Sequence, residues 1–274
     1  MKNANILMLL AAFLLTFTAC KRTPGCTDPA SVNYNPEAKK DDGSCLVPEQ
    51  VQELFVCKWT GVNCGPCGSS TTYMHENVEP TYGASMNTVY MHCQNNSMNL
   101  WYNNSLKTIM PTGGGIPKWY LNGNLIHYMD FIDTIPVYLA QSPIGACVGK
   151  MSIENDVLKV KTCVKFFEDS EGSYELGVYV VQHGIPATDG MEQSGGGTDF
   201  IHNHAFRYTM NSGSVGDNLT GQSIRKDIGY FQEYEVAIDA EWVASDLQVI
   251  LVLWKSADDL TDYVYINSNT AVIE

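Results

Sequence analysis

The amino-acid sequence predicts an α/β domain followed by an all-β domain. Residues 48–142 alternate short apolar strands with helix-like stretches, which is the pattern of a mixed sheet covered by helices. Residues 143–274 instead hold many strand-length apolar runs separated by turn residues, with no stretch of helical period. This second pattern predicts an antiparallel β-sandwich of jelly-roll-like architecture. A chain of 274 residues, 45% of them hydrophobic, is long enough for two domains of modest size.

Residues 1–20 have the pattern of a lipoprotein signal peptide. Lys2 supplies a charged start, and residues 6–17 form an apolar stretch that is too short to span a bilayer. Thr18-Ala19-Cys20 resembles the lipobox of bacterial lipoproteins, in which the cysteine is lipidated and becomes the first residue of the mature chain. The alternative is an ordinary signal peptide with an incidental cysteine. We expect lipidation at Cys20.

Residues 21–47 form a polar, cysteine-bracketed spacer. An exported chain meets an oxidising environment, so its cysteines are candidates for disulfides. Cys26 and Cys45 bracket a stretch that is too polar to bury a core, and a bridge between them would stabilise it by about 3 kcal/mol. Asp and Asn side chains in this stretch could bind calcium, but their spacing does not match an EF-hand loop. We therefore expect a disulfide-stapled spacer.

The α/β domain is expected to begin with a strand and a helix on either side of a cysteine motif. Turn and periodicity signals then place a second strand, a second helix, a hairpin around Asn122-Gly123-Asn124 and a closing helix. In order, these elements are a strand at 51–59, a helix at 66–77, a strand at 88–93, a helix at 99–109, strands at 119–121 and 125–127, and a helix at 131–141.

The motif between the first strand and helix is Cys64-Gly65-Pro66-Cys67. Two cysteines separated by two residues at a helix start form a redox pair, because unpaired N–H groups and the helix dipole favour a thiolate at the first cysteine. Pro66 suits the first helical turn, where a missing N–H costs little. The alternatives are a structural disulfide and half of a zinc site. Zinc would need a second close pair of ligands, and the sequence has no second Cys-x-x-Cys.

This motif resembles that of thioredoxin, in which Gly-Pro also separates the cysteines. Gly115-Ile116-Pro117 before a strand is similar to the thioredoxin segment whose cis-proline lies against the active-site pair. The resemblance implies a thioredoxin-like domain with Cys64 as the attacking thiolate and Cys67 as the resolving thiol. It also implies that Ile116 and Pro117 present their backbone to a substrate peptide, with a cis bond between them.

Lys58 departs from the thioredoxin pattern. It stands where many thioredoxins carry a buried acid beneath the second cysteine. An ammonium there would stabilise thiolates and tune the redox potential, but it could not accept the proton of Cys67 unless it were deprotonated. The alternative is that the Lys58 side chain extends to solvent.

The strand runs of the second domain are separated by turn signals. They lie at 146–153, 157–167, 174–183, 205–210, 230–238, 247–254 and 263–266. If Ile153 faces Val157 across a hairpin around Asn155, then Cys147 faces Cys163, and we expect a disulfide between them. Cys57 and Cys93 fall on strands that are neighbours in a thioredoxin sheet, so they are either bridged or buried thiols.

The order of lipobox, Cys-x-x-Cys, Gly-Ile-Pro and the later stretch Phe200-Ile201-His202-Asn203-His204 resembles the 28-kDa outer-membrane lipoprotein family of the Bacteroidetes. That family implies an outer-membrane location but no established activity. We expect anchoring on the periplasmic face, with the cell surface as the alternative. His202 and His204 would share one face of a strand and could begin a metal site, but a hydrogen-bonded histidine pair is the simpler interpretation, so no metal is assigned.

These features predict a membrane-anchored, exported thiol–disulfide oxidoreductase that needs no cofactor and acts on protein thiols or disulfides. The alternative is a non-enzymatic lipoprotein that uses the thioredoxin-like domain as a scaffold and the sandwich to bind a protein or glycan. The formal net charge of −14 argues against nucleic acid as a partner.

Overall fold

A computed structural model describes residues 23–93, 98, 106–111, 113–188, 190–196, 199–213, 215–219, 223–256 and 263–273. The expected signal peptide, its lipidated Cys20 and most of the helix expected at 99–109 lie outside these residues. The described residues fall into two compact units, one within Met1–Pro29 and Asn33–Cys45, the other within Ala30–Val32 and Leu46–Glu274. No helix in the described part of the chain is long and apolar enough to cross a membrane.

The small unit is held by one disulfide and several turns. Cys26 and Cys45 are bonded, as the sequence predicts, with their Cα atoms 4.7 Å apart. Asn35 and Asp41 each accept a hydrogen bond from a backbone N–H two residues on, which fixes the local turns. The unit therefore depends on covalent and turn chemistry rather than on a hydrophobic core.

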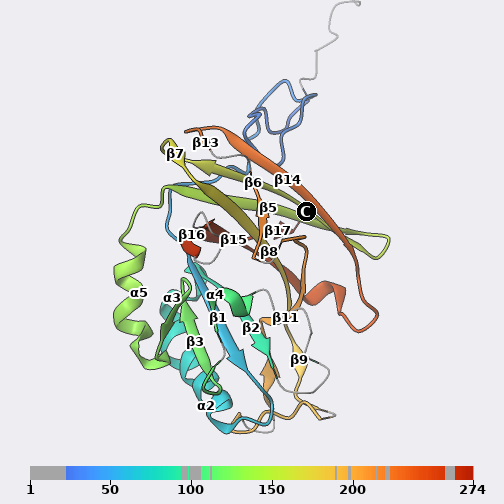
Figure 1. Ribbon diagram of the computed structural model, residues 1–274. Helices are drawn as coiled ribbons and strands as arrows, with labels where there is room; N and C mark the ends of the chain where they lie inside the picture. The colour runs from blue at the N-terminus through green and yellow to red at the C-terminus, as the bar shows by residue number, and fades with distance from the viewer. Residues whose placement is uncertain are drawn as a thin grey trace, which may run out of the picture. The chain divides into compact units, whose positions relative to one another are not determined.

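The large unit contains a nine-stranded mixed sheet with the strand order β16-β15-β8-β11-β2-β1-β3-β4, and β12 pairs with β8 (Figure 1). Its strands are β1 (Leu54–Thr60), β2 (Met86–His92), β3 (Lys118–Leu121), β4 (Asn124–Ile126), β8 (Ser173–Gln182), β11 (Ala205–Thr209), β12 (Asp217–Asn218), β15 (Leu247–Ser256) and β16 (Tyr263–Thr270).

Residues 54–139 follow the order that the sequence predicts. β1 runs parallel to β2 and antiparallel to β3, and β3 pairs with β4 through a two-residue turn. Asn122 and Gly123 in that turn have φ values of 54° and 83°, as a type I′ turn requires. The helical segments are α2 (Gly65–Tyr73), a π-helix (Met74–Val78), α3 (Glu79–Tyr82), 3-10 turns at Gly83–Ser85 and Tyr128–Asp130, α4 (Leu106–Ile109) and α5 (Phe131–Leu139).

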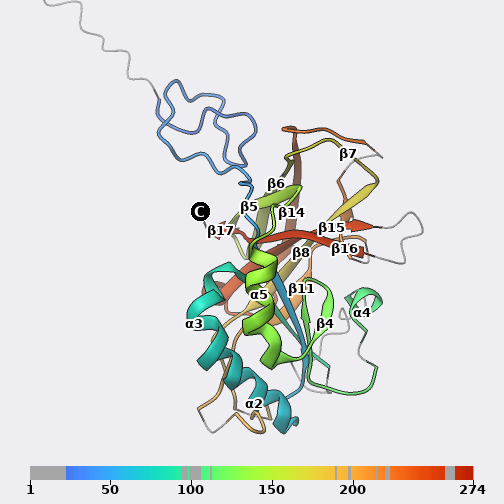
Figure 2. The same ribbon diagram turned by 90° about the vertical axis from the view of Figure 1, so that its left-hand side faces the viewer.

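The two faces of β1 carry two different cores. Leu54 and Val56 pack in one core with Phe131 of α5 and Met74 of the π-helix. α2, α3 and α5 lie along this side of the sheet, as both views show (Figures 1 and 2). The alternate residues of β1 face the opposite core, which also takes side chains from β8, β11 and β15. This period of two positions Lys58 on the face that α2 covers.

The large sheet does not stop at the expected domain boundary after residue 142. β11 pairs in parallel with β2 at Ala205 and Tyr90, and the Tyr90 N–H donates to the carbonyl oxygen of His204 at 2.7 Å. Strands from both halves of the chain therefore belong to one sheet.

A four-stranded sheet covers the C-terminal part of the large sheet. Its order is β14 (Gly229–Ala237), β6 (Val157–Phe166), β5 (Gly145–Glu154) and β17 (Val272–Ile273). One core lies between the sheets and includes Val160 and Phe166 from β6, Val178 from β8 and Leu251 from β15. The packing is that of two layered sheets, but one layer continues into the α/β part, so the strands after residue 142 do not form the separate sandwich domain that the sequence predicts.

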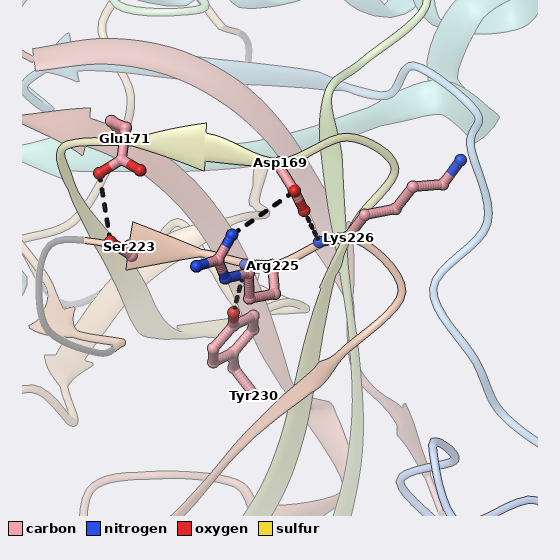
Figure 3. Close-up of polar contacts among 6 residues, drawn as sticks. All are labelled: Asp169, Glu171, Ser223, Arg225, Lys226 and Tyr230. Carbon is pink, nitrogen blue, oxygen red and sulfur yellow. Dashed lines mark hydrogen bonds and ion pairs between the residues drawn. The ribbon is translucent and has the colours of Figure 1, made fainter.

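Two further pairs of short strands form separate two-stranded sheets. β9 (Ile185–Pro186) pairs with β10 (Ile201–His202), and β7 (Ser170–Glu171) pairs with β13 (Ser223–Ile224). Figure 3 shows how the second pair is held: Asp169 accepts a 2.7 Å hydrogen bond from the Lys226 N–H and lies 3.6 Å from the Arg225 guanidinium. The Asp169 and Arg225 side chains are exposed, so the ion pair contributes little to stability.

The expected Cys147–Cys163 disulfide is wrong. Asn155 and Asp156 form a two-residue turn with φ values of 51° and 59°, so Glu154, not Ile153, faces Val157. This shifts the register by one residue, and Cys147 pairs with Val164. Because a shift of one residue turns a side chain to the other face of the sheet, Cys147 enters the core between the sheets while Cys163 packs with Val32 on the outer face.

Asn267 connects β16 to two other parts of the large unit. Its side chain, 1% exposed, accepts from the Glu53 N–H at 2.9 Å and donates to the carbonyl oxygens of Val51 at 2.9 Å and Gly145 at 3.4 Å. Asn267→Leu leaves these buried groups unsatisfied, so we expect the free energy of unfolding to fall by about 2 kcal/mol. Urea unfolding of the full-length protein measures this. The exposed Asn124→Ala is the control, with a change within about 0.5 kcal/mol, and an equally small change for Asn267→Leu would contradict the assignment.

Candidate redox site

The N-terminus of α2 carries the cysteine pair. Cys64 is the N-cap residue, Pro66 lies in the first turn, and Cys64 and Cys67 are joined by a disulfide. The Cys67 N–H donates to the Cys64 sulfur at 3.2 Å. A sulfur that already accepts a backbone N–H at a helix start is in a position to be stabilised as a thiolate when the pair is reduced.

The two cysteines differ in exposure. Cys64 is 8% exposed and Cys67 is fully buried. Of the two cysteines, only Cys64 therefore contributes to the protein surface.

The second predicted segment lies beside this pair. The Ile116–Pro117 peptide bond is cis, as the sequence predicts. The carbonyl oxygen of Ile116 is 3.8 Å from the Cys64 sulfur. In the disulfide this sulfur has no proton, so the distance records a close approach rather than a hydrogen bond. The structure thus brings together residues that are about fifty positions apart in the sequence.

An open groove begins at the two prolines next to the disulfide. It has a volume of about 600 Å³ and is mainly apolar. Leu125, on the edge strand β4, is 62% exposed. The lining residues are Pro66, Pro117, Lys118, Trp119, Leu125, Ile126, His127 and Tyr128. The groove offers apolar contact area within reach of Cys64.

Lys58 lies beneath α2 and does not extend to solvent. Its side chain is 1% exposed, and its ammonium nitrogen donates to the Cys67 carbonyl oxygen at 2.9 Å and to the Thr71 hydroxyl. The nitrogen also lies 4.7 Å from the centre of the Trp119 ring and 5.1 Å from that of Tyr90. Burial disfavours the ammonium and lowers the pKa of Lys58 to about 7.

Lys58 therefore loses its proton much closer to neutral pH than an exposed lysine does. The neutral amine has a lone pair and can accept a proton, which an ammonium cannot do.

The sequence does not single out Gln193. Its side chain, 6% exposed, has Nε2 within hydrogen-bond distance of the carbonyl oxygens of Gly61 at 3.1 Å, Val62 at 3.2 Å and Cys64 at 3.2 Å, which share its two N–H groups with the Ser194 carbonyl oxygen at 3.1 Å. The one sequence signal nearby is the run of glycines at 195–197, which indicates a loop but not its destination.

Cys57 and Cys93 are poor nucleophiles. They are not bridged, and burial raises the pKa of each thiol, most strongly for Cys57. Cys93 is half-buried, and its thiol donates to the Thr60 carbonyl oxygen at 3.3 Å. Neither is poised to react as a thiolate.

The histidine pair does not form the expected common face. β10 ends at His202, and His204 has a φ of 55°, which interrupts the alternation before β11 begins. The His202 ring donates from Nε2 to the Met191 carbonyl oxygen at 2.7 Å, while the His204 ring packs on His183. Within the described residues, no three His, Cys, Asp or Glu side chains gather as metal ligands would.

Comparison with known proteins gives a fold but no family. No family model and no curated protein matches the sequence. Among solved structures, HBP35 of Porphyromonas gingivalis is similar, with a TM-score of 0.68 at 15% identity, over 81% of this chain and 76% of that one. A domain of the outer-membrane lipoprotein Omp28 from the same organism matches 48% of this chain and 89% of its own length at 13% identity, but its TM-score of 0.32 is too low to indicate a shared fold. The chain is therefore similar in fold to HBP35 over most of its length.

Proposed function

We propose that this protein is an exported, membrane-anchored thiol–disulfide oxidoreductase of thioredoxin type. The observation that carries the proposal is the position of Cys64, whose sulfur lies at the N-terminus of α2, 3.8 Å from the Ile116 carbonyl oxygen and beside an open apolar groove. A disulfide with a purely structural role needs neither a helix N-terminus beneath its sulfur nor an apolar groove next to it.

The reaction begins with the reduced pair. The Cys64 thiolate attacks one sulfur of a substrate disulfide, a mixed disulfide forms, and the other substrate sulfur leaves as a thiolate. Cys67 then loses its proton and attacks the Cys64 sulfur. The Cys64–Cys67 disulfide forms, the second substrate sulfur leaves, and two electrons have passed to the substrate. Run backwards, the same steps oxidise a substrate dithiol, and no cofactor takes part in either direction.

Lys58 supplies the proton acceptor for the second step. Its amine forms a hydrogen bond with the Cys67 carbonyl oxygen and is buried. When neutral, it takes the proton of the Cys67 thiol as the thiol becomes the attacking group. When charged, it stabilises both thiolates and favours the reduced pair.

The substrate is a polypeptide with a thiol or disulfide. Its chain lies against the backbone of Ile116 and Pro117, and apolar side chains enter the groove toward Leu125 and Tyr128. Lipidation at Cys20 would anchor the enzyme to the outer membrane, facing the periplasm. The lipobox-like Thr18-Ala19-Cys20 and the family resemblance of the sequence support the membrane anchor, and the lack of an acidic cluster in Lys21-Arg22-Thr23-Pro24 supports the periplasmic face over the cell surface.

Insulin reduction by the full-length protein in the presence of dithiothreitol tests the proposal. We expect precipitation of the insulin B chain to be accelerated over dithiothreitol alone, because Cys64 is placed to attack an external disulfide. Cys93→Ser is the matched control and should keep the full rate, because its half-buried thiol bonds to Thr60 and not to the pair. An unaccelerated rate would favour the non-enzymatic lipoprotein instead.

A further inference from the structure

A loop from the C-terminal half of the chain lies against the cysteine motif. We call residues 190–196 the Gln193 loop. It follows β9, and both views show this segment beside the N-terminal end of α2 (Figures 1 and 2). The Ser194 N–H donates to the Val62 carbonyl oxygen at 2.8 Å. The thioredoxin-like residues 48–142 therefore do not complete the surroundings of the disulfide by themselves.

Gln193 anchors this loop. Its amide nitrogen lies within 3.2 Å of the carbonyl oxygens of Gly61, Val62 and Cys64, which belong to the turn that leads into α2, and of the neighbouring Ser194 carbonyl oxygen. Because this amide is buried, few water molecules are available to replace it.

The backbones of the loop and the helix are in direct contact. A Cβ atom at Gly68 would overlap the Ser194 carbonyl oxygen, and one at Gly195 would overlap that of Gly65. No side chain fits between the two segments, so the loop closes this side of the motif. At its other end, the Met191 carbonyl oxygen is held by His202 at 2.7 Å.

The opposite side of the motif is open. The apolar groove begins at Pro66 and Pro117 and continues along β4. The disulfide thus has one closed and one open side, and only 8% of the Cys64 surface is exposed.

We propose that the Gln193 loop is a fixed wall that determines which disulfides reach Cys64. A disulfide on an extended polypeptide segment enters from the Pro66–Pro117 side, whereas a disulfide set in a broad folded surface collides with the wall. Gln193 acts as a positioning residue by holding the wall to the turn before α2. This inference gives the substrate class for the proposed function and rests on it. The effect of the wall can nevertheless be measured separately, from the rates at which reductants of different size reduce the Cys64–Cys67 disulfide.

The test compares two reductants of different size. Reduction of the oxidised full-length protein is followed with tris(2-carboxyethyl)phosphine and with reduced thioredoxin, which presents its thiol on a folded surface. In Gln193→Ala the anchor is lost. A hydrogen bond contributes about 1 kcal/mol net, so its loss should increase about fivefold the fraction of molecules in which the loop has moved away from the turn before α2. We expect the rate with thioredoxin to rise about fivefold while the rate with phosphine stays within about twofold.

A second variant moves the wall without touching Gln193. Gly68→Ala puts a methyl group against the Ser194 carbonyl oxygen, so we expect the same selective rise. Two control variants carry the same substitutions at positions away from the loop. Gln232→Ala removes an amide that donates to the Asn218 carbonyl oxygen at 3.2 Å, and Gly83→Ala adds a methyl group at an ordinary contact distance of 3.5 Å from Glu79. Both should leave the two rates unchanged. If Gln193→Ala does not fold, Gly68→Ala alone decides.

Parallel rises with both reductants would overturn the wall, because they would show a general loosening of the site. Unchanged rates in both variants would overturn it as well. A selective rise combined with no insulin reduction would support the wall and contradict the proposed function, so the two failures are distinguishable.

Discussion

We expect Cys64→Ser to abolish insulin reduction and Cys67→Ser to accumulate a stable mixed disulfide with the substrate. The first substitution removes the only sulfur of the pair that an external disulfide can reach, because Cys67 is fully buried. We expect a loss of about 10³-fold or more, since the attacking nucleophile is gone. The second keeps the attacking sulfur but removes the group that releases the product.

Non-reducing gel electrophoresis and mass spectrometry of the reaction with insulin measure both outcomes. Cys67→Ser should gain the mass of an insulin molecule, because one attack opens only one of the disulfides of insulin, and dithiothreitol should remove this mass. Cys57→Ser is the control because its thiol is fully buried on the opposite face of β1 and should not change the outcome. Mixed disulfides formed through Cys67 in the Cys64→Ser protein would reverse the assigned roles.

The first strand, the turn with the cysteine pair and the hairpin after Pro117 could be predicted from the sequence because each depends on local signals. The apolar run of β1 ends at Thr60, the motif starts α2, and Asn122-Gly123 specifies a type I′ turn. Such signals act over a few residues and need no knowledge of the rest of the chain.

At the hairpin around Asn155, the sequence predicts both strands correctly but gives the wrong pairing register between them. Both strands lie within one residue of their expected ends, yet the two cysteines are not bridged. A turn of two residues at Asn155 and Asp156, rather than one centred on Asn155, shifts the register by one. Alternation along a strand then separates Cys147 from Cys163.

The wall and the continuous sheet could not be predicted because both depend on contacts between distant segments. β11 meets β2 through a single residue pair, Ala205 with Tyr90, and no sequence pattern encodes so short a contact. Gln193 lies about 130 residues from the carbonyl groups it holds. A glutamine shortly before three glycines is typical of a surface loop, and only the packed structure shows that it is buried.

The position of Lys58 could be predicted from the sequence only in part. The resemblance to thioredoxin positions it under the second cysteine, but the sequence does not determine whether its side chain reaches solvent. In the structure Lys58 follows Leu54 and Val56 at intervals of two along β1, so it shares their buried face. Its bond to the Cys67 carbonyl oxygen then holds the amine under α2, and this contact depends on how the helix packs on the sheet.

Replacing Lys58 is expected to slow the release of the mixed disulfide and to change the redox potential. Lys58→Met removes the proton acceptor, so resolution by Cys67 should slow about 100-fold near neutral pH. In the wild type the resolution rate should rise as pH increases through about 7, because burial lowers the pKa of Lys58 to about 7 and the neutral amine is the base. That inflection should be absent from Lys58→Met. Rapid mixing of the reduced protein with a disulfide-bonded peptide measures these rates.

Lys58→Asp separates the effect of charge from that of proton transfer. A carboxylate beneath Cys67 disfavours thiolates and therefore the reduced pair, so the potential should become more negative by about 30 mV or more, which corresponds to about 1.4 kcal/mol. The same carboxylate can accept the proton of Cys67, so resolution should be faster than in Lys58→Met. Lys159→Met is the control, because this exposed lysine pairs with Glu154 at 2.6 Å on another hairpin and should leave the potential unchanged. Redox titration in glutathione buffers gives the potentials. Equal potentials for the wild type and Lys58→Asp, together with equal resolution rates for the wild type and Lys58→Met, would show that the buried amine takes no part in the reaction.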